Sequence, residues 1–355
     1  MLVMLDDLNL ISEIDKSNMF GDLASFPDQI KNSKDIVDSS NLPNLYKVDD
    51  IVISGMGASS ISGDIVQSLF RDRLDIPIYV NRQYDLPKWA NKNTLLISQS
   101  YSGDTEETLH SFKHGFQKRC KIIGISSGGK LQESCEKRNV PHIKIPEGIQ
   151  PRAAIGYILF SSIYSMKKVG ILNIDIDKEI EESILITTEL KESNKKEIPT
   201  KDNLSKQIAN KIFNTVPQVY GWEIYSPIAR RWCTQLNENS KLICKYDFLT
   251  ECNHNDIVGW SMDSDFSKKC SCVLFRDDEN ESVYLSKRLD FMRNLFNDVA
   301  KNVIEVKVMG KKRLAKMLYA LYLGDFVSCY LGVLRKIDPT PIIAITELKN
   351  ELEKL

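Results

Sequence analysis

Short apolar runs alternate with longer amphipathic segments along residues 49–165. Each apolar run is bounded by glycine, serine, proline or asparagine, and each longer segment repeats its apolar residues with the period of a helix. This alternation predicts parallel strands connected by helices on both faces of a sheet. The expected strands are 49–55, 76–80, 93–98, 121–126 and 141–146, and the expected helices are 59–71, 104–118, 129–138 and 153–165.

A second alternation begins near residue 215, where an apolar run again ends at a glycine. Its expected strands are 215–221, 242–246, 271–275 and 302–308, and its expected helices are 223–238, 283–297, 311–335 and 341–355. We interpret the two alternations as a structural duplication, which predicts an α/β protein with two doubly wound parallel sheets.

The length of 355 residues corresponds to about two domains. We expect a helical N-terminal segment at 1–45, a first domain at 46–170, a charged linker at 171–206 and a second domain at 207–355, which includes the C-terminal helix. The segment 171–206 is rich in Lys, Glu, Asp and Asn, so we expect it to form a solvated surface connection. Two domains would create a cleft in which a small ligand binds.

The charge balance and the N-terminus narrow the function classes. With a formal net charge of -1, no basic field favours nucleic acid. Residues 1–7 contain no basic segment of the kind that opens a signal peptide. No apolar stretch is expected to approach the roughly 18 residues that a membrane helix needs. We therefore expect a cytoplasmic protein that binds neither nucleic acid nor a membrane.

The cysteines and histidines argue against a metal site. The eight cysteines are scattered without CxxC spacing, and the four histidines form neither an HxH nor an HExxH pattern. We expect reduced thiols, no metal and no other cofactor.

The segment Ser98-Gln-Ser-Tyr-Ser-Gly-Asp-Thr105, called here the serine turn, joins a predicted strand to a predicted helix. Hydroxyl groups of Ser100, Ser102 and Thr105, together with amides exposed at Gly103 and the positive end of the helix, could bind a phosphate group. The alternative is an ordinary helix N-cap by Ser102 or Asp104.

A second turn, Ser54-Gly-Met-Gly-Ala-Ser-Ser-Ile-Ser62, called here the glycine turn, follows the first strand. It lacks the GxGxxG spacing of dinucleotide sites, and no acidic residue follows the next strand, so a dinucleotide is disfavoured. Gly57, Ala58 and Ser59 could instead bind phosphate, and the alternative for Ser59 is again an N-cap. Because both turns follow parallel strands, we expect them to share one crevice.

Six short motifs resemble those of a known family. They are Gly55-Met-Gly-Ala-Ser59, Ser100-Tyr-Ser-Gly-Asp-Thr105, Pro151-Arg-Ala-Ala154, Gln235-Leu-Asn-Glu-Asn239, Glu251-Cys-Asn-His-Asn255 and Asp338-Pro-Thr-Pro341 with Lys349 after it. In this order, from about residue 50 to the end, they resemble the two-domain bifunctional phosphoglucose/phosphomannose isomerases of archaeal type, which are built from sugar isomerase (SIS) domains.

The resemblance implies an aldose-ketose isomerase that binds a sugar phosphate and needs neither metal nor nucleotide. Such a reaction moves a proton between C1 and C2 through an enediolate, which requires a carboxylate base, a cation near the oxyanion and an acid/base group that opens the sugar ring. By resemblance, Glu238 is the base, Arg152 faces the enediolate, and His254 and Lys349 open the ring. In the family the histidine comes from the neighbouring subunit, which implies a homodimer. Thr340 is a further candidate, for the acceptance of mannose.

Several positions depart from the family pattern or permit other interpretations. Ala58 stands where glycine is commoner, and Asp104 where asparagine is usual; a carboxylate beside a bound dianion is unfavourable unless it points away or caps a helix. Without the resemblance, Glu238 would be interpreted as a solvated residue late in a helix and Arg152 as a surface or capping residue.

Two other function classes remain as rivals. The first is a non-catalytic sugar-phosphate sensor, although no basic helix-turn-helix segment is evident at either end. The second is a fragment of a glucosamine-phosphate synthase or a deaminase-like transferase, but an amidotransferase needs a cysteine after Met1, where Leu2 stands.

Overall fold

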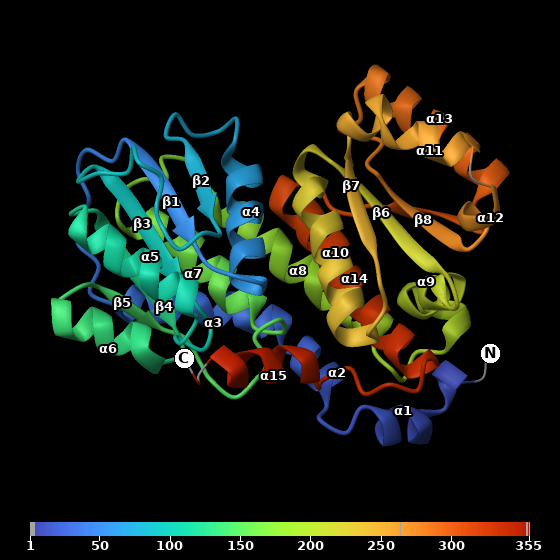
Figure 1. Cartoon of the computed structure of the whole chain (residues 1–355), viewed down its shortest axis with the longest axis horizontal. Helices are drawn as coiled ribbons and strands as arrows, with labels where there is room; N and C mark the ends of the chain where they lie inside the picture. The colour runs from blue at the N-terminus through green and yellow to red at the C-terminus, as the bar shows by residue number, and fades with distance from the viewer. Residues whose placement is uncertain (1–3, 263, 353, 355) are drawn as a thin grey trace.

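Two parallel sheets form the framework of the computed structural model, which describes residues 4–262, 264–352 and 354 (Figure 1). The first sheet has the strand order β2-β1-β3-β4-β5 and is parallel throughout. Its strands are β1 (Asp50–Ser54), β2 (Ile78–Asn81), β3 (Thr94–Gln99), β4 (Lys121–Ser126) and β5 (His142–Lys144). The order reverses between β1 and β3, which is the point where ligands bind in doubly wound folds.

Helices cover both faces of the first sheet, as the alternation of the sequence predicts. Because neighbouring side chains in a strand point to opposite faces, Ile51 and Ile53 pack on one side and Val52 on the other. Helices α4 (Ala58–Phe70) and α7 (Ile155–Lys168) cover the first of these faces, and α5 (Glu106–Gln117) and α6 (Gly129–Arg138) cover the second.

The second sheet has the order β7-β6-β8-β9 and is also parallel. It repeats the order of the first four strands of the first sheet, which agrees with the interpretation of a duplication. Its strands are β6 (Val216–Trp222), β7 (Lys245–Leu249), β8 (Cys270–Arg276) and β9 (Asn302–Lys307), and its main helices are α10 (Ser226–Ser240), α13 (Val283–Val299) and α14 (Arg313–Leu334). The predicted fold class is confirmed.

The charged segment 171–206 is not the solvated connection that its composition suggests. It forms α8 (Asp177–Asn194), which packs along α14 and buries Ile180, Ile186 and Leu190. Charged residues between these apolar positions cover the outer side of the helix. The composition of the segment as a whole therefore gave no sign that one face of the helix is apolar and buried. The segment therefore contributes to the core.

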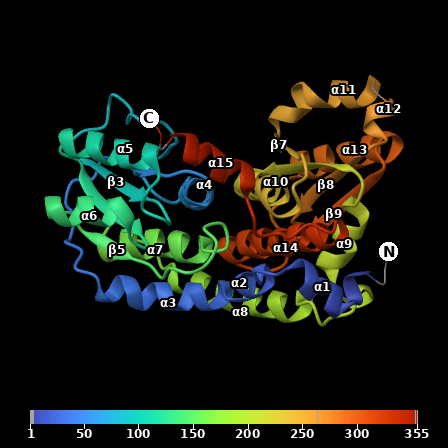
Figure 2. The same cartoon turned by 60° about the horizontal axis from the view of Figure 1, so that its bottom comes forward.

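The N-terminal segment is helical, as expected, and spans both halves of the protein. Its helices are η1 (Met4–Asp6), α1 (Leu8–Ile14), α2 (Met19–Ala24) and α3 (Phe26–Ser39). Helix α2 packs on α14 and α3 packs on α7, so one chain segment connects the cores of the two sheets (Figure 2).

The expectation that no apolar stretch is long enough for a membrane helix is wrong for α14, which is long and apolar enough to cross a membrane. However, 94% of its most apolar 18-residue window is buried inside the protein. It packs against α8, α9 (Leu204–Ile212) and α10. A helix that is apolar on all sides is expected at the centre of a core, and this is the position that α14 occupies.

Three helices of the second half were not expected from the sequence. They are α9, α11 (Asp256–Met262) and α12 (Ser264–Ser267), and β7 begins at Lys245 rather than near residue 242. The C-terminal helix α15 (Ile343–Leu352) agrees with prediction, and none of its described residues is buried. It lies near the junction of the two halves, at the lower edge of Figure 1 and at the upper centre of Figure 2.

Candidate active site

The serine turn and the glycine turn lie side by side at one edge of the first sheet. Strands β1 and β3 are neighbours, and Ser54 and Ser98 at their carboxyl ends are paired in register. Gln99, at the end of β3, donates to the carbonyl of Ser59 at 2.5 Å and to the hydroxyl of Ser62 at 2.7 Å. These contacts join the two turns at the position where the strand order reverses.

Hydroxyl groups are held in place within the serine turn. The Ser100 and Thr105 hydroxyls are 2.8 Å apart, and the amide of Gly103 donates to the Ser100 hydroxyl at 3.1 Å. Ser100 is buried and Ser102 is exposed. The N-cap residue of α5 is Thr105, and no side-chain hydrogen bond caps this helix. The N-cap interpretation of Ser102 and Asp104 is therefore wrong for α5.

The glycine turn has the same character. Gly57 precedes α4 with φ +53°, and no side-chain hydrogen bond caps α4. Ala58 is the first residue of the helix, and Ser59 is buried in its first turn. Two helix N-termini whose amides lack a side-chain cap thus converge with the hydroxyls of the serine turn, an arrangement suited to an anion.

Asp104 points away from the position where an anion would bind. One oxygen of its carboxylate accepts a hydrogen bond from the amide of Lys130 at 3.0 Å, in the first turn of α6. The neighbouring Gly103 has φ +78°, and a Cβ there would lie 1.9 Å from the carbonyl oxygen of Gly128. Only glycine permits this close approach, which directs the Asp104 side chain to the neighbouring helix.

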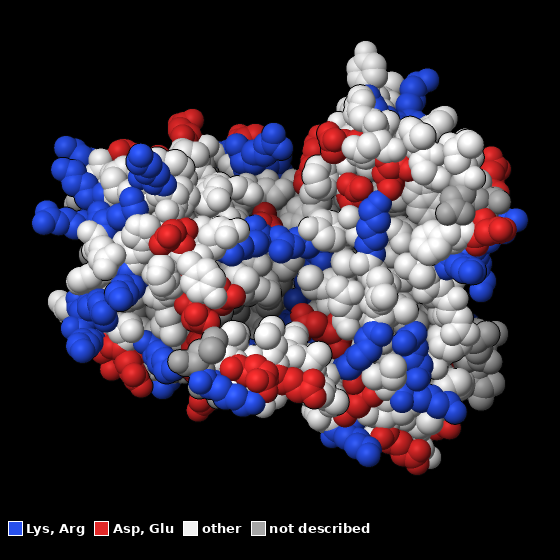
Figure 3. Space-filling model, viewed as in Figure 1, with Lys and Arg blue, Asp and Glu red and all other residues white. Residues whose placement is uncertain are grey.

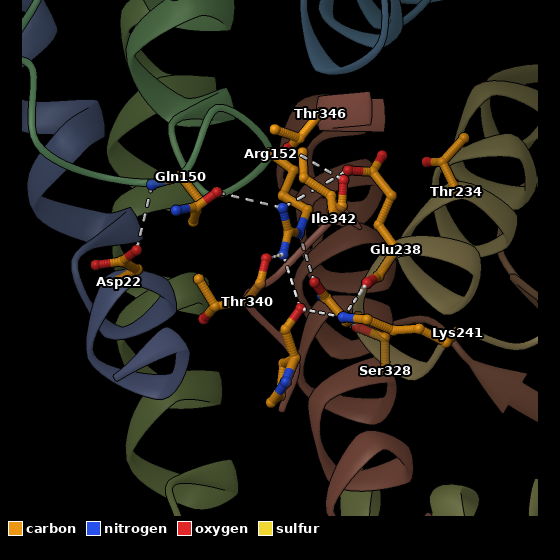
Figure 4. Close-up of polar contacts among 12 residues, drawn as sticks. Asp22, Gln150, Arg152, Thr234, Glu238, Lys241, Ser328, Thr340, Ile342 and Thr346 are labelled. Atoms are coloured by element: carbon orange, nitrogen blue, oxygen red, sulfur yellow. Dashed lines mark hydrogen bonds and ion pairs between the residues drawn. The ribbon is translucent and has the colours of Figure 1, made fainter. Parts of the chain in front are cut away.

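Arg152 is the centre of a hydrogen-bond network between the two halves (Figure 4). Its side chain is only 3% exposed. The guanidinium donates from Nε to Asn239 Oδ1 at 2.6 Å, and from Nη2 to the carbonyl oxygens of Pro339 and Thr340, both at 2.8 Å. Nη1 reaches Gln150 Oε1 at 3.5 Å. Burial lowers the pKa of Arg152, and the negative charge of a nearby glutamate opposes this effect.

That glutamate is Glu238, near the end of α10. Its Oε2 lies 3.7 Å from Arg152 Nη1, and its side chain is 27% exposed. A carboxylate that is partly accessible to solvent, beside a fixed guanidinium, is placed to exchange a proton with a ligand in the same space. The structure thus brings together the two residues that the sequence motifs proposed as base and cation.

A buried ion pair between α10 and α14 holds the main chain of Arg152 in place. The Arg231 guanidinium binds the Asp325 carboxylate at 3.0 and 2.9 Å, and it also donates to the main-chain carbonyl of Arg152 at 2.6 Å. Both partners are almost fully buried. Because α10 and α14 carry the pair, the core of the second half fixes the backbone of Arg152.

Curated relatives establish the family. A bifunctional phosphoglucose/phosphomannose isomerase from Caldicellulosiruptor bescii is 37% identical, covering 95% of this chain and 99% of that protein. The chain belongs to the family of bifunctional phosphoglucose/phosphomannose isomerases. A second member, from Aquifex aeolicus, is 33% identical over 86% of this chain and 90% of its own length. The resemblance predicted from the motifs is confirmed.

Two further comparisons agree with the fold. Residues 201–352 match the family model of the bacterial phospho-glucose isomerase C-terminal SIS domain. The crystal structure of a hypothetical protein from Thermus thermophilus aligns with a TM-score of 0.75 at 12% identity, over 99% of this chain and 94% of that chain. At this identity the likeness concerns the fold alone.

Two of the residues singled out by the family motifs lie on the surface of the chain. His254 is exposed in η4 (Glu251–His254) after β7, and Lys349 is exposed on α15. Among the described contacts, neither joins the Arg152 network. Their family roles therefore stay predictions.

Lys241 belongs to the network but was not singled out by the sequence, whereas the turn 338–340 lies in one of the family motifs and joins the network through its main-chain carbonyls. The Lys241 ammonium donates to the carbonyls of Glu238, Asp338 and Pro339 at 2.8, 2.9 and 2.8 Å. In the sequence, Lys241 looks like an ordinary charged residue after a helix, because its left-handed conformation is not visible there. The carbonyl acceptors carry no sequence signal of any kind.

The corresponding edge of the second sheet has a different chemistry. Asp277 follows β8, as the serine turn follows β3, and it is 3% exposed. Its carboxylate accepts from Tyr225 and Asn280 and binds the Lys316 ammonium. The carboxylate of Asp277 thus occupies this edge, and its hydrogen bonds are made within the protein. Because a carboxylate and a phosphate are both negatively charged, this edge would repel a phosphate. The duplicated fold thus keeps one phosphate-type edge.

A groove of about 910 Å³ lies at the far ends of α4 and α10, away from the Arg152 network, and residues Asp64, Arg230, Tyr246 and Phe248 are among those that line it. In Figure 3, basic and acidic side chains both occur along the hollow between the halves.

Within the described residues, no group of three His, Cys, Asp or Glu side chains could hold a metal ion.

Proposed function

We propose that the protein reversibly converts glucose 6-phosphate and mannose 6-phosphate into fructose 6-phosphate through an enediolate. Membership of the family supports this reaction. The observation that carries it is the pairing of Glu238 with Arg152 at 3.7 Å between the two halves. A sensor needs a phosphate site but has no use for a carboxylate base beside a fixed cation.

In the proposed mechanism, the phosphate binds to Ser59, Ser100, Ser102 and Thr105 and to the amides that begin α4 at Gly57 and Ala58. The two adjoining turns, with helix N-termini that no side chain caps, support this assignment. The phosphate would hold one end of the sugar, and the reacting carbons at the other end would reach the Arg152 network.

Glu238 then removes the proton from C2 of the open-chain aldose and returns it to C1. The electron pair of the broken C–H bond passes into the enediolate, whose negative oxygen Arg152 stabilises. Arg152 is suited to this role because three acceptors already hold its guanidinium in place.

We further propose that His254 and Lys349 open the sugar ring and that His254 acts in the site of a second copy. Exposed apolar side chains near His254 support a homodimer: Val258 is 62% exposed and Met262 is 83% exposed. Such side chains, so close to a polar exposed histidine, suit an interface better than solvent. The proposed setting is the cytoplasm.

A coupled assay on glucose, mannose and fructose 6-phosphates tests the reaction. We expect turnover of all three, before and after exhaustive treatment with a chelator. Inactivity on all three would favour a sensor, and loss of activity with the chelator would contradict the metal-free mechanism.

Mixed dimers test the shared site. We expect His254→Ala and Glu238→Gln proteins to be inactive alone, and an equal mixture, after exchange of subunits, to recover about a quarter of wild-type activity, because half of the dimers contain one intact site. If both residues act within one chain, no activity returns.

A further inference from the structure

Lys241 connects the end of the helix that carries Glu238 to the turn that binds Arg152. It follows α10 in the left-handed region, with φ +50°, and its side chain folds back beneath the last turn of the helix. Its ammonium donates to the carbonyl of Glu238 at 2.8 Å and to those of Asp338 and Pro339 at 2.9 and 2.8 Å. An ammonium has three donors, and these three contacts use all of them.

The same turn is bound from the opposite side by Arg152. The carbonyl of Pro339 accepts from Lys241 Nζ and from Arg152 Nη2, both at 2.8 Å, and the carbonyl of Thr340 accepts from Arg152 as well. Figure 4 shows Lys241 and Arg152 converging on this turn while Glu238 extends above it. One carbonyl therefore joins the two cations, and the position of the base relative to Arg152 depends on both.

We propose that Lys241 is a positioning residue for the isomerisation: by joining α10 to the turn 338–340, it fixes the distance between Glu238 and Arg152. This inference rests on the proposed function. Lys241 itself reaches main-chain carbonyls, so it acts through Glu238 and not on the sugar.

The surroundings of the ammonium make this bridge dependent on pH. Desolvation, followed by the positive charge of Arg152, lowers the pKa of Lys241 to about 8, while Asp338, Cys329 and Glu238 act in the opposite direction. As the pH rises through this value, the folded protein loses the proton and one of the three donors. The bridge should therefore weaken progressively as the pH rises through about 8.

The kinetics of Lys241→Met and Lys241→Arg, compared with wild type, test the inference. For Lys241→Met we expect kcat to fall about tenfold to a hundredfold on both aldose phosphates with KM nearly unchanged, because a small displacement of a catalytic group has effects of this size. In Lys241→Arg, whose guanidinium keeps its charge, the decline of kcat above pH 8 should move to higher pH.

Lys336→Met is the matched control. Lys336 also has a positive φ, of +58°, after a helix, and like Lys241 it is exposed to solvent, but no described hydrogen bond joins its ammonium to the turn 338–340. Its replacement removes the same charge and should leave kcat and its pH dependence unchanged. Thermal unfolding of all variants separates a fall in kcat from a loss of folded protein.

The outcomes distinguish the two levels of the proposal. An active wild type together with a Lys241→Met protein whose kcat is unchanged, or whose KM alone rises, overturns the role of Lys241. An unshifted pH profile in Lys241→Arg overturns it as well. A wild type that converts none of the three sugar phosphates overturns the proposed function itself.

Discussion

Replacement of Arg152 by lysine keeps the positive charge and removes the planar group that the network binds. The guanidinium reaches Asn239 Oδ1 at 2.6 Å and two main-chain carbonyls at 2.8 Å in different directions. A single ammonium on a flexible stem cannot satisfy all of these acceptors from the position of the guanidinium. At least one buried acceptor would lose its partner.

The size of the effect follows from these contacts. A hydrogen bond to a charged group contributes about 1.5–3 kcal/mol to stability, and an acceptor left without a partner costs a similar amount. A donor lost beside a developing oxyanion costs about 2.7–4 kcal/mol, or roughly 100- to 1000-fold in kcat. We therefore expect Arg152→Lys to lower kcat by about this factor and to lower the free energy of unfolding by a few kcal/mol.

The assay is the coupled conversion of glucose 6-phosphate and mannose 6-phosphate, with kcat and KM measured separately, beside thermal unfolding of the same preparations. Because the phosphate site is separate from Arg152, KM should change much less than kcat. A folded Arg152→Lys protein with kcat within about fivefold of wild type would refute the requirement for a fixed guanidinium.

Three further predictions concern the serine turn and its neighbours. Gly103→Ala should raise KM for sugar phosphates more than about tenfold, because its Cβ would meet a carbonyl oxygen at 1.9 Å and displace the turn; an unchanged KM would contradict this. Asp104→Ala should lower the free energy of unfolding by about 1 kcal/mol, because the contact of the carboxylate with the first turn of α6 is lost. Asp104→Asn should leave KM for sugar phosphates nearly unchanged. A tenfold lower KM in Asp104→Asn would mean that the carboxylate repels phosphate. Burial lowers the pKa of His142 from 6.5 to about 4, so the unfolded chain binds a proton that the folded protein does not, and the free energy of unfolding should fall as the pH decreases from about 6.5 to about 4. Denaturant titrations of His142→Gln should show a weaker dependence over this range, and an identical dependence would exclude His142 as its source.

Most strands of both sheets could be predicted because buried parallel strands are short continuous apolar runs. The prediction for β7 begins about three residues too early, because this strand is mostly exposed and has no continuous apolar run. The motif residues Arg152 and Glu238 are 86 positions apart in the sequence, and the structure places their side chains 3.7 Å apart; their catalytic roles stay predictions. Packing of α8 could not be predicted in the same way, because its apolar residues are diluted among many charged ones and become a stripe only once the helix is formed.

Asp104 and Lys241 show what the sequence could not provide. An aspartate in a phosphate-type turn looks unfavourable until the position of α6, which begins 25 residues later, supplies an amide for its carboxylate. Lys241 binds carbonyl groups of a turn almost a hundred residues away. Both contacts are made to main-chain groups that only the tertiary structure brings close. Because every residue type has the same main-chain atoms, the sequence does not mark which residues will accept or donate these bonds.

The central claim is that Glu238 transfers the proton. The most direct test measures the turnover of saturating fructose 6-phosphate by Glu238→Gln and, in parallel, the binding of the sugar phosphate by calorimetry. The account predicts binding close to that of wild type and a kcat lower by about 100- to 10,000-fold, the usual contribution of general acid-base catalysis. A Glu238→Gln protein that binds normally and turns over at the wild-type rate would contradict it.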